Sequence, residues 1–85
     1  MQLVGSKPLN AAYARFRMGE VLHKNGKLDE ADAMLRSSLV VRAKALGDAN
    51  AGTQAVLQEL VAVSTERGKP EEAAAFRARL VPASK

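Results

Sequence analysis

The sequence predicts an all-α protein made of two antiparallel helical hairpins, four helices in all, stacked as a short α-solenoid. Apolar residues recur at intervals of three and four along the chain, the spacing of a helix face. Glycines at positions 26, 47 and 68 punctuate the helical segments. The eight-residue pattern at 26–33 recurs in similar form at 68–75, which gives a period of 68 − 26, or 42, residues. A fixed period of this size is typical of stacked repeats.

The first hairpin is expected to occupy residues 8–47, after a leader at 1–7 that has no apolar period. Its first helix should span about 8–25, with Pro8 in the first turn and apolar residues on two adjoining faces. Its second helix should span about 28–46, with Asp29 and Glu30 opposing the positive end of the helix dipole. The residues expected to be buried along this second helix are Leu28, Ala31, Leu35, Ser38, Leu39, the Arg42 stem and Leu46.

The second hairpin is expected to occupy residues 48–81, followed by a tail at 82–85. Its helices should span about 52–67, with Asn50 or Thr53 as the N-cap, and 70–81, beginning at Pro70. Connections as short as these make neighbouring helices antiparallel. The inward residues of these two helices are expected to be Val56, Leu57, Leu60, Val61, Val63, Ser64, Ala73, Phe76 and Leu80.

Composition limits the classes of protein to consider. The chain has 85 residues, 47% of them hydrophobic and only 4% aromatic, so the predicted core is thin and closely spaced. It has no cysteine, which excludes disulfides and thiolate metal sites. No apolar run approaches the ~18 residues of a membrane span, and the start does not resemble a secretory signal. We therefore expect a cytoplasmic protein with no membrane partner.

No pattern of catalytic residues is present, and we expect no enzyme, cofactor or metal. His23 is the only histidine, so it has no second histidine or cysteine as a co-ligand. It is better explained by its place at the negative end of the first helix. Asp29, Glu30 and Asp32 form an acidic trio, but first-turn dipole compensation explains them better than acid–base chemistry.

The two hairpins resemble tetratricopeptide repeats over about residues 8–81. Gly19 stands at the place of the family's small residue where the two helices touch, and Ala31 and Ala73 match its alanine early in the second helix. Arg15 and Val61 depart from the pattern. The 42-residue period and the segment 37–47 resemble the longer repeats of kinesin light chains, also seen in C-terminal regions of bacterial multidomain proteins.

This resemblance implies a concave binding face lined by the first helix of each hairpin. The residues at the matching positions are Tyr13, Phe16, Arg17, Glu20 and Lys24 in the first hairpin, and Ala55, Gln58, Glu59, Ala62 and Glu66 in the second. Aromatic residues dominate binding hot spots, which makes Tyr13 and Phe16 the best anchors for a partner. The alternative, equally weighted, is that they pack on a preceding helix or on the leader.

We therefore expect a non-catalytic protein–protein interaction or scaffold module, from the C-terminal part of a larger protein. Its partner would be a protein or peptide, and the apolar outer side of the first helix would meet an upstream repeat or a second copy of the chain. One alternative is a small basic helical nucleic-acid-binding domain, suggested by the net charge of +4. Its binding would weaken steeply with salt and depend on Arg15, Arg17, Arg36 and Arg42. Acids interleave with these bases, so we do not favour it. A structural spacer beside an enzymatic domain is the other alternative.

Overall fold

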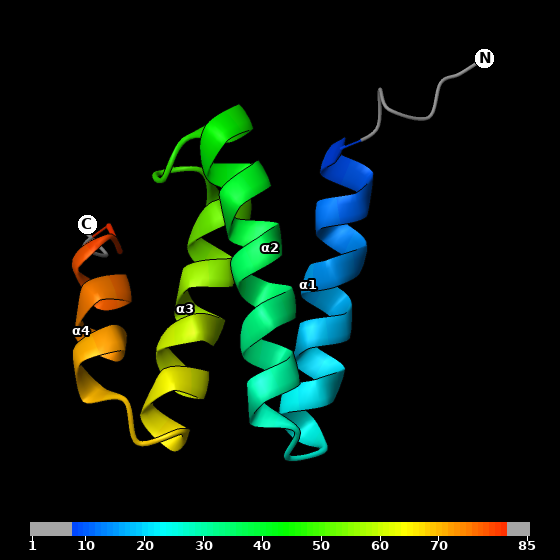
Figure 1. The fold of residues 1–85 in the computed structure, drawn as a ribbon. Coiled ribbons are helices and arrows are strands. Elements are labelled where there is room, and N and C mark those ends of the chain that lie inside the picture. Colours follow the sequence, from blue (N-terminus) through cyan, green and yellow to red (C-terminus); the bar gives the residue numbers. More distant parts are fainter. Residues whose placement is uncertain (1–7, 82–85) are drawn as a thin grey trace.

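The computed structural model describes residues 8–81 and confirms the all-α fold of helical hairpins (Figure 1). Its helices are α1 (Pro8–Lys24), α2 (Leu28–Leu46), α3 (Ala51–Glu66) and α4 (Pro70–Ala78). They lie side by side in chain order, and each packs mainly on its neighbours along the chain, while α1 also touches α3. The pairs α1–α2 and α3–α4 form the two hairpins, which meet through α2 and α3. The expected leader at 1–7 and tail at 82–85 lie outside the described residues.

The turn between α1 and α2 is closed by Gly26, which adopts a φ of 78° that only glycine reaches readily. The N–H of Gly26 donates to the carbonyl of His23 at 3.0 Å, and the N–H of Lys27 donates to the carbonyl of Leu22 at 2.9 Å. These two bonds form a Schellman motif, which satisfies carbonyls left free at the end of α1.

The turn between α3 and α4 repeats this geometry 42 residues later. Gly68 has a φ of 75°. Its N–H donates to the carbonyl of Thr65 at 3.1 Å, and the N–H of Lys69 donates to the carbonyl of Ser64 at 2.9 Å. Both turns lie at the same end of the stack (Figure 1). The repeat seen in the sequence is therefore also a repeat of backbone geometry.

The last helix ends at Ala78, earlier than the predicted residue 81. The N–H groups of Arg79 and Leu80 bond to carbonyls three residues back, which tightens the final turn. The side chain of Gln54 in α3 then hydrogen-bonds to the residues that follow α4. Its Oε1 accepts from the N–H of Val81 at 2.8 Å, and its Nε2 donates to the carbonyl of Arg79 at 3.2 Å. A side chain from another helix thus stabilises the chain where it leaves α4.

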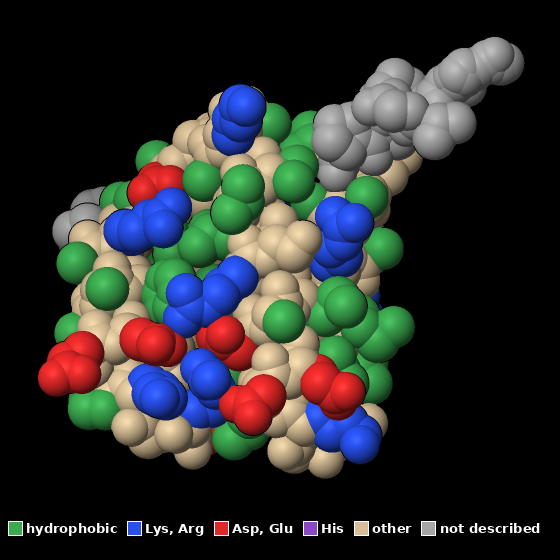
Figure 2. Space-filling view, in the orientation of Figure 1, with side chains coloured by type: hydrophobic (Ala, Val, Ile, Leu, Met, Phe, Trp, Pro, Cys, Tyr) green, Lys and Arg blue, Asp and Glu red, His purple; other side chains and the backbone are tan. Residues whose placement is uncertain are grey.

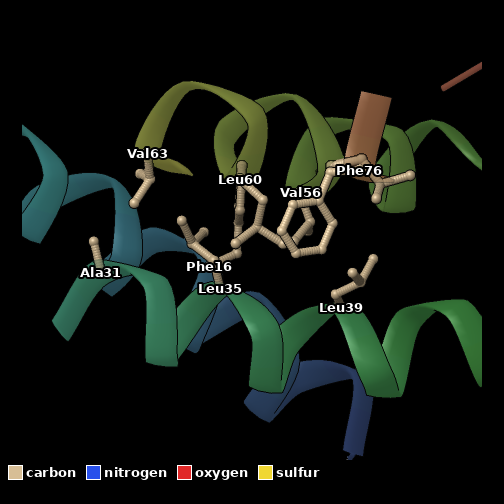
Figure 3. Packing of buried hydrophobic residues seen from close by; sticks show 9 residues of the cluster. Phe16, Ala31, Leu35, Leu39, Val56, Leu60, Val63 and Phe76 are labelled. Atoms are coloured by element: carbon tan, nitrogen blue, oxygen red, sulfur yellow. The ribbon is translucent and has the colours of Figure 1, made fainter. Parts of the chain in front are cut away.

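The core lies where α2 and α3 face each other, with Phe16 and Phe76 entering from α1 and α4 (Figure 3). The buried stripe predicted for α2 is confirmed from Ala31 to Arg42, but at its two ends Leu28 is half-buried and Leu46 is exposed. The predicted inward residues of α3 are buried, except for Val61, which is half-buried. Leucine is the commonest residue of this core, which contains Leu35, Leu39, Leu57 and Leu60.

Between the hairpins, the chain is held by side chains at both ends of the loop. Asn50 is the N-cap of α3, because its side chain accepts from the N–H of Gly52 at 2.8 Å. Arg42 of α2 donates from Nη1 to the carbonyl of Gly52 at 2.9 Å. Asp48 pairs with Arg79 beyond α4, at 2.9 Å. The connection between the two hairpins is therefore bonded to α2 and to the end of α4.

Candidate functional site

The residues predicted to line a binding face lie on α1 and α3, and His23 of α1 contacts two of them, Glu59 and Glu66. His23 Nδ1 lies 2.5 Å from Glu59 Oε2, and its Nε2 lies 2.7 Å from Glu66 Oε2. Both ring nitrogens face a carboxylate, which suits the doubly protonated imidazolium because that form donates from both nitrogens. The hydrogen bond to Glu59, then that to Glu66, raises the pKa of His23. Burial opposes this shift without cancelling it.

Sequence reasoning missed this ion-pair bridge. It assigned His23 to the dipole of α1 and placed Glu59 and Glu66 in the binding face as independent side chains. The two contacts span 36 and 43 residues, so no local spacing predicts them. The consequence is that both carboxylates already have a partner inside the molecule.

Phe16 corrects a prediction. It was expected either to anchor a partner or to pack on a preceding helix or the leader. It is instead only 9% exposed and belongs to the core formed with α2 and α3 (Figure 3). Its position on α1 faces the inside of the stack, toward Leu35 and Leu60. Phe16 is therefore a structural residue of the described chain.

Tyr13, one turn before Phe16, is 55% exposed. The guanidinium of Arg42 lies 5.7 Å from the Tyr13 ring centroid and 5.3 Å from that of Phe16. Such cation–π contacts orient an aromatic ring while leaving its outer side open. Tyr13 is thus held in place by α2 and remains accessible as the aromatic residue of the concave face.

The remaining predicted residues differ in how accessible they are. Arg17 is exposed and pairs with Glu20 at 3.2 Å, an i,i+3 surface pair of modest strength. Lys24 and Gln58 are exposed. Ala55 and Ala62 are half-buried. The accessible part of the face therefore consists of one aromatic ring with polar and basic neighbours.

A second accessible surface lies on the outer side of α1, away from α2. Its largest members are Met18, 50% exposed, and Val21, 52% exposed. Ala11 and Ala14 lie on the same helical face and are also exposed. We call these four residues the outer stripe of α1. The sequence had predicted that α1 is apolar on two sides, and the described residues leave this side uncovered.

Two acids of the predicted trio, Asp29 and Asp32, join the hairpins by pairing with Arg67. Asp29 pairs with Arg67 at 2.9 Å, and Asp32 pairs with Arg36 at 2.8 Å. Arg36 also reaches Glu72 of α4 at 2.8 Å. Figure 2 shows basic and acidic side chains gathered near the end of the stack that carries both hairpin turns. Asp32 is buried here, which the sequence had not predicted.

Within residues 8–81, no three acidic or histidine side chains are arranged to hold a metal ion. A hollow on α2 is lined by Val40, Val41, Lys44 and Ala45, with no pair of titratable groups to exchange a proton. None of the described helices combines the length and apolarity that crossing a membrane requires.

Comparisons with protein-family models, with curated proteins and with solved structures give no significant match to this chain. The resemblance to tetratricopeptide repeats therefore stays a prediction from the residues quoted above.

Proposed function

We propose that this chain is a non-catalytic protein-binding or scaffold module of tetratricopeptide type that acts in the cytoplasm. The observation that carries the proposal is the exposure of large apolar residues on α1. Met18 and Val21 are half exposed on the outer stripe, and Tyr13 is exposed on the neighbouring concave face. Contiguous exposed apolar side chains of this kind mark interaction surfaces in soluble proteins.

The repeated turns support the same proposal. The two hairpins are closed by the same hydrogen bonds, and their first helices, α1 and α3, run in the same direction (Figure 1). Such an array provides an extended surface formed by several helices, and no enclosed cavity for a substrate. A partner would contact side chains from both hairpins, with Tyr13 as an aromatic anchor.

The nucleic-acid alternative has less support. Arg42 is buried and bonded to the Gly52 carbonyl, and Arg36 is held by Asp32 and Glu72. Arg17 pairs with Glu20. Most of the arginines on which that alternative depended are therefore already engaged within the chain.

The proposal is tested by affinity capture with the full chain and two matched variants. Met18→Lys places a charge on the outer stripe, and Val40→Lys places the same charge on an exposed valine of α2. We expect a protein recovered in stoichiometric amount with the natural chain and with Val40→Lys, and lost with Met18→Lys. Light scattering of the purified chain identifies a second copy as that partner if mass rises with concentration. Capture that both variants retain equally, or binding only to nucleic acid with steep salt dependence, would refute the proposal.

A further inference from the structure

The interface between the two hairpins shows what the outer stripe of α1 is built to contact. Val56, Leu60 and Val63 of α3 are fully buried and point toward α2 (Figure 3). Opposite them lie Leu35 and Leu39 of α2. An apolar stripe on the first helix of one hairpin thus docks on the second helix of the preceding hairpin.

The same stripe occurs on α1. Ala14, Met18 and Val21 stand 42 residues before the three α3 residues just named. Ala11 stands 42 residues before the buried Thr53 of α3. Four of the six buried positions of α3 therefore carry an exposed apolar residue in α1, where no described helix covers them. Of the other two, Leu57 corresponds to the exposed Arg15 and Ser64 to the half-buried Leu22.

We propose that the outer stripe of α1 docks the second helix of another helical hairpin, in the geometry by which α3 docks on α2, and that the first helix of this hairpin presents a carboxylate to Arg17 and Lys24. The inference rests on the proposed protein-binding function and names the chemistry of the partner.

The carboxylate of the partner is inferred from the charges at equivalent positions of α1 and α3. Glu59 and Glu66 of α3 receive the imidazolium of His23 from the preceding hairpin. In α1 the residues 42 positions earlier are Arg17, which pairs at the surface with Glu20 at 3.2 Å, and Lys24. Two bases and one acid thus leave a net positive charge where α3 has two carboxylates. A hairpin docked on α1 in the same way places its residue equivalent to His23 beside these two bases. An acid is favourable there and a cation is repelled.

A second natural copy of this chain does not fit this description. Arg77 of α4 stands 42 residues after Leu35, so the second hairpin offers a charge where the stripe needs a large apolar side chain. The first hairpin offers His23, a cation, to Arg17 and Lys24. The second helix of that hairpin is also already covered by α3. The partner is therefore a different hairpin.

The test adds such a hairpin to the full chain in the natural register. Residues 1–50 are joined to residues 9–85, so the loop that precedes Ala51 precedes Leu9 instead. The added hairpin carries His23→Glu in one protein, the natural His23 in a second and His23→Lys in a third. Because the chain has no cysteine, Met18→Cys in the retained copy places a single thiol on the outer stripe.

The readout is the rate at which this thiol reacts with a soluble disulfide reagent. With His23→Glu in the added hairpin, we expect reaction roughly tenfold slower than in the 85-residue chain with the same thiol, which corresponds to about 1.4 kcal/mol of docking free energy. The His23→Lys protein should be the least protected. Val40→Cys in the retained copy, at a residue 66% exposed on α2, is the control and should react equally in all chains.

If the thiol of the Met18→Cys variant reacts equally fast with and without the added hairpin, the proposal is overturned. This holds also where circular dichroism shows that the added hairpin stays unfolded. If the thiol is protected equally whichever residue stands at position 23 of the added hairpin, the carboxylate assignment is overturned. Failure of the capture experiment above, with protection still observed, would instead reject the cellular role and leave the docking surface intact.

Discussion

Gly19 of α1 lies so close to Leu35 of α2 that a Cβ placed on the glycine would come within 2.7 Å of Leu35 Cδ2. Leu35 is fully buried between α1 and α3, so its side chain has little freedom to move away. We expect Gly19→Ala to lower the free energy of unfolding. Overpacking costs about 1–3 kcal/mol, which exceeds the ~1 kcal/mol by which alanine favours a helix over glycine. Urea unfolding followed by circular dichroism measures the difference.

The control is a double-mutant cycle. In a Leu35→Ala background the added methyl group has space, so Gly19→Ala should be neutral or stabilising there. If Gly19→Ala stabilises the natural chain, close packing at this crossing is not what requires the glycine.

Arg42 of α2 contacts two other helices at once, α3 through its hydrogen bond to Gly52 and α1 through its cation–π contacts with Phe16 and Tyr13. Lysine keeps the charge but has neither the planar group nor the several donors of arginine. We expect Arg42→Lys to lower the free energy of unfolding by about 1–2 kcal/mol. Arg15→Lys, at an exposed residue of α1, is the matched control and should change stability by less than about 0.5 kcal/mol. Equal effects of both substitutions in a thermal melt would contradict this role.

Stability should depend on pH through His23. Its pKa is raised in the folded chain by Glu59 and Glu66, above the ordinary value of about 6.5. The folded state therefore binds the proton more tightly, and the stabilisation is complete below the ordinary pKa. It is lost as pH rises through the raised pKa of the folded chain. We expect the urea midpoint to fall over this window above pH 6.5.

Two variants isolate the histidine. His23→Gln has no charge to lose and should remove the dependence across this window. Glu59→Gln should weaken it, because the largest cause of the raised pKa is removed. A midpoint that falls equally in the His23→Gln chain would assign the effect to another group.

The two Schellman turns should respond alike to the same substitution. Gly26 and Gly68 share positive φ, and no atom lies within 4 Å of a Cβ placed on either. Alanine at either position should therefore lower the free energy of unfolding only through the strain of the left-handed backbone, by roughly 1–2 kcal/mol. Asparagine tolerates this conformation better and should cost less at both sites. Denaturation curves giving clearly unequal losses for Gly26→Ala and Gly68→Ala would show that the two turns are not equivalent.

The sequence predicted what depends on local spacing. Helices, glycine turns and the stripe through Leu35 follow from patterns within one or two turns of the chain, and the 42-residue repeat located both hairpins. It did not predict features that depend on another helix. Phe16 is buried because α2 and α3 enclose it, and the pKa of His23 is raised by carboxylates of α3. The chain where it leaves α4 is stabilised by Gln54, also from α3.

Because of Tyr13, the fluorescence of this chain is distributed unevenly between its two hairpins. It is the single tyrosine, and the chain has no tryptophan, so its ultraviolet emission reports on one hairpin only. The other hairpin contributes phenylalanine alone and is nearly silent. Circular dichroism, in contrast, averages over every helix. A separation between the two melting curves would therefore measure directly how independently the halves of the molecule come apart.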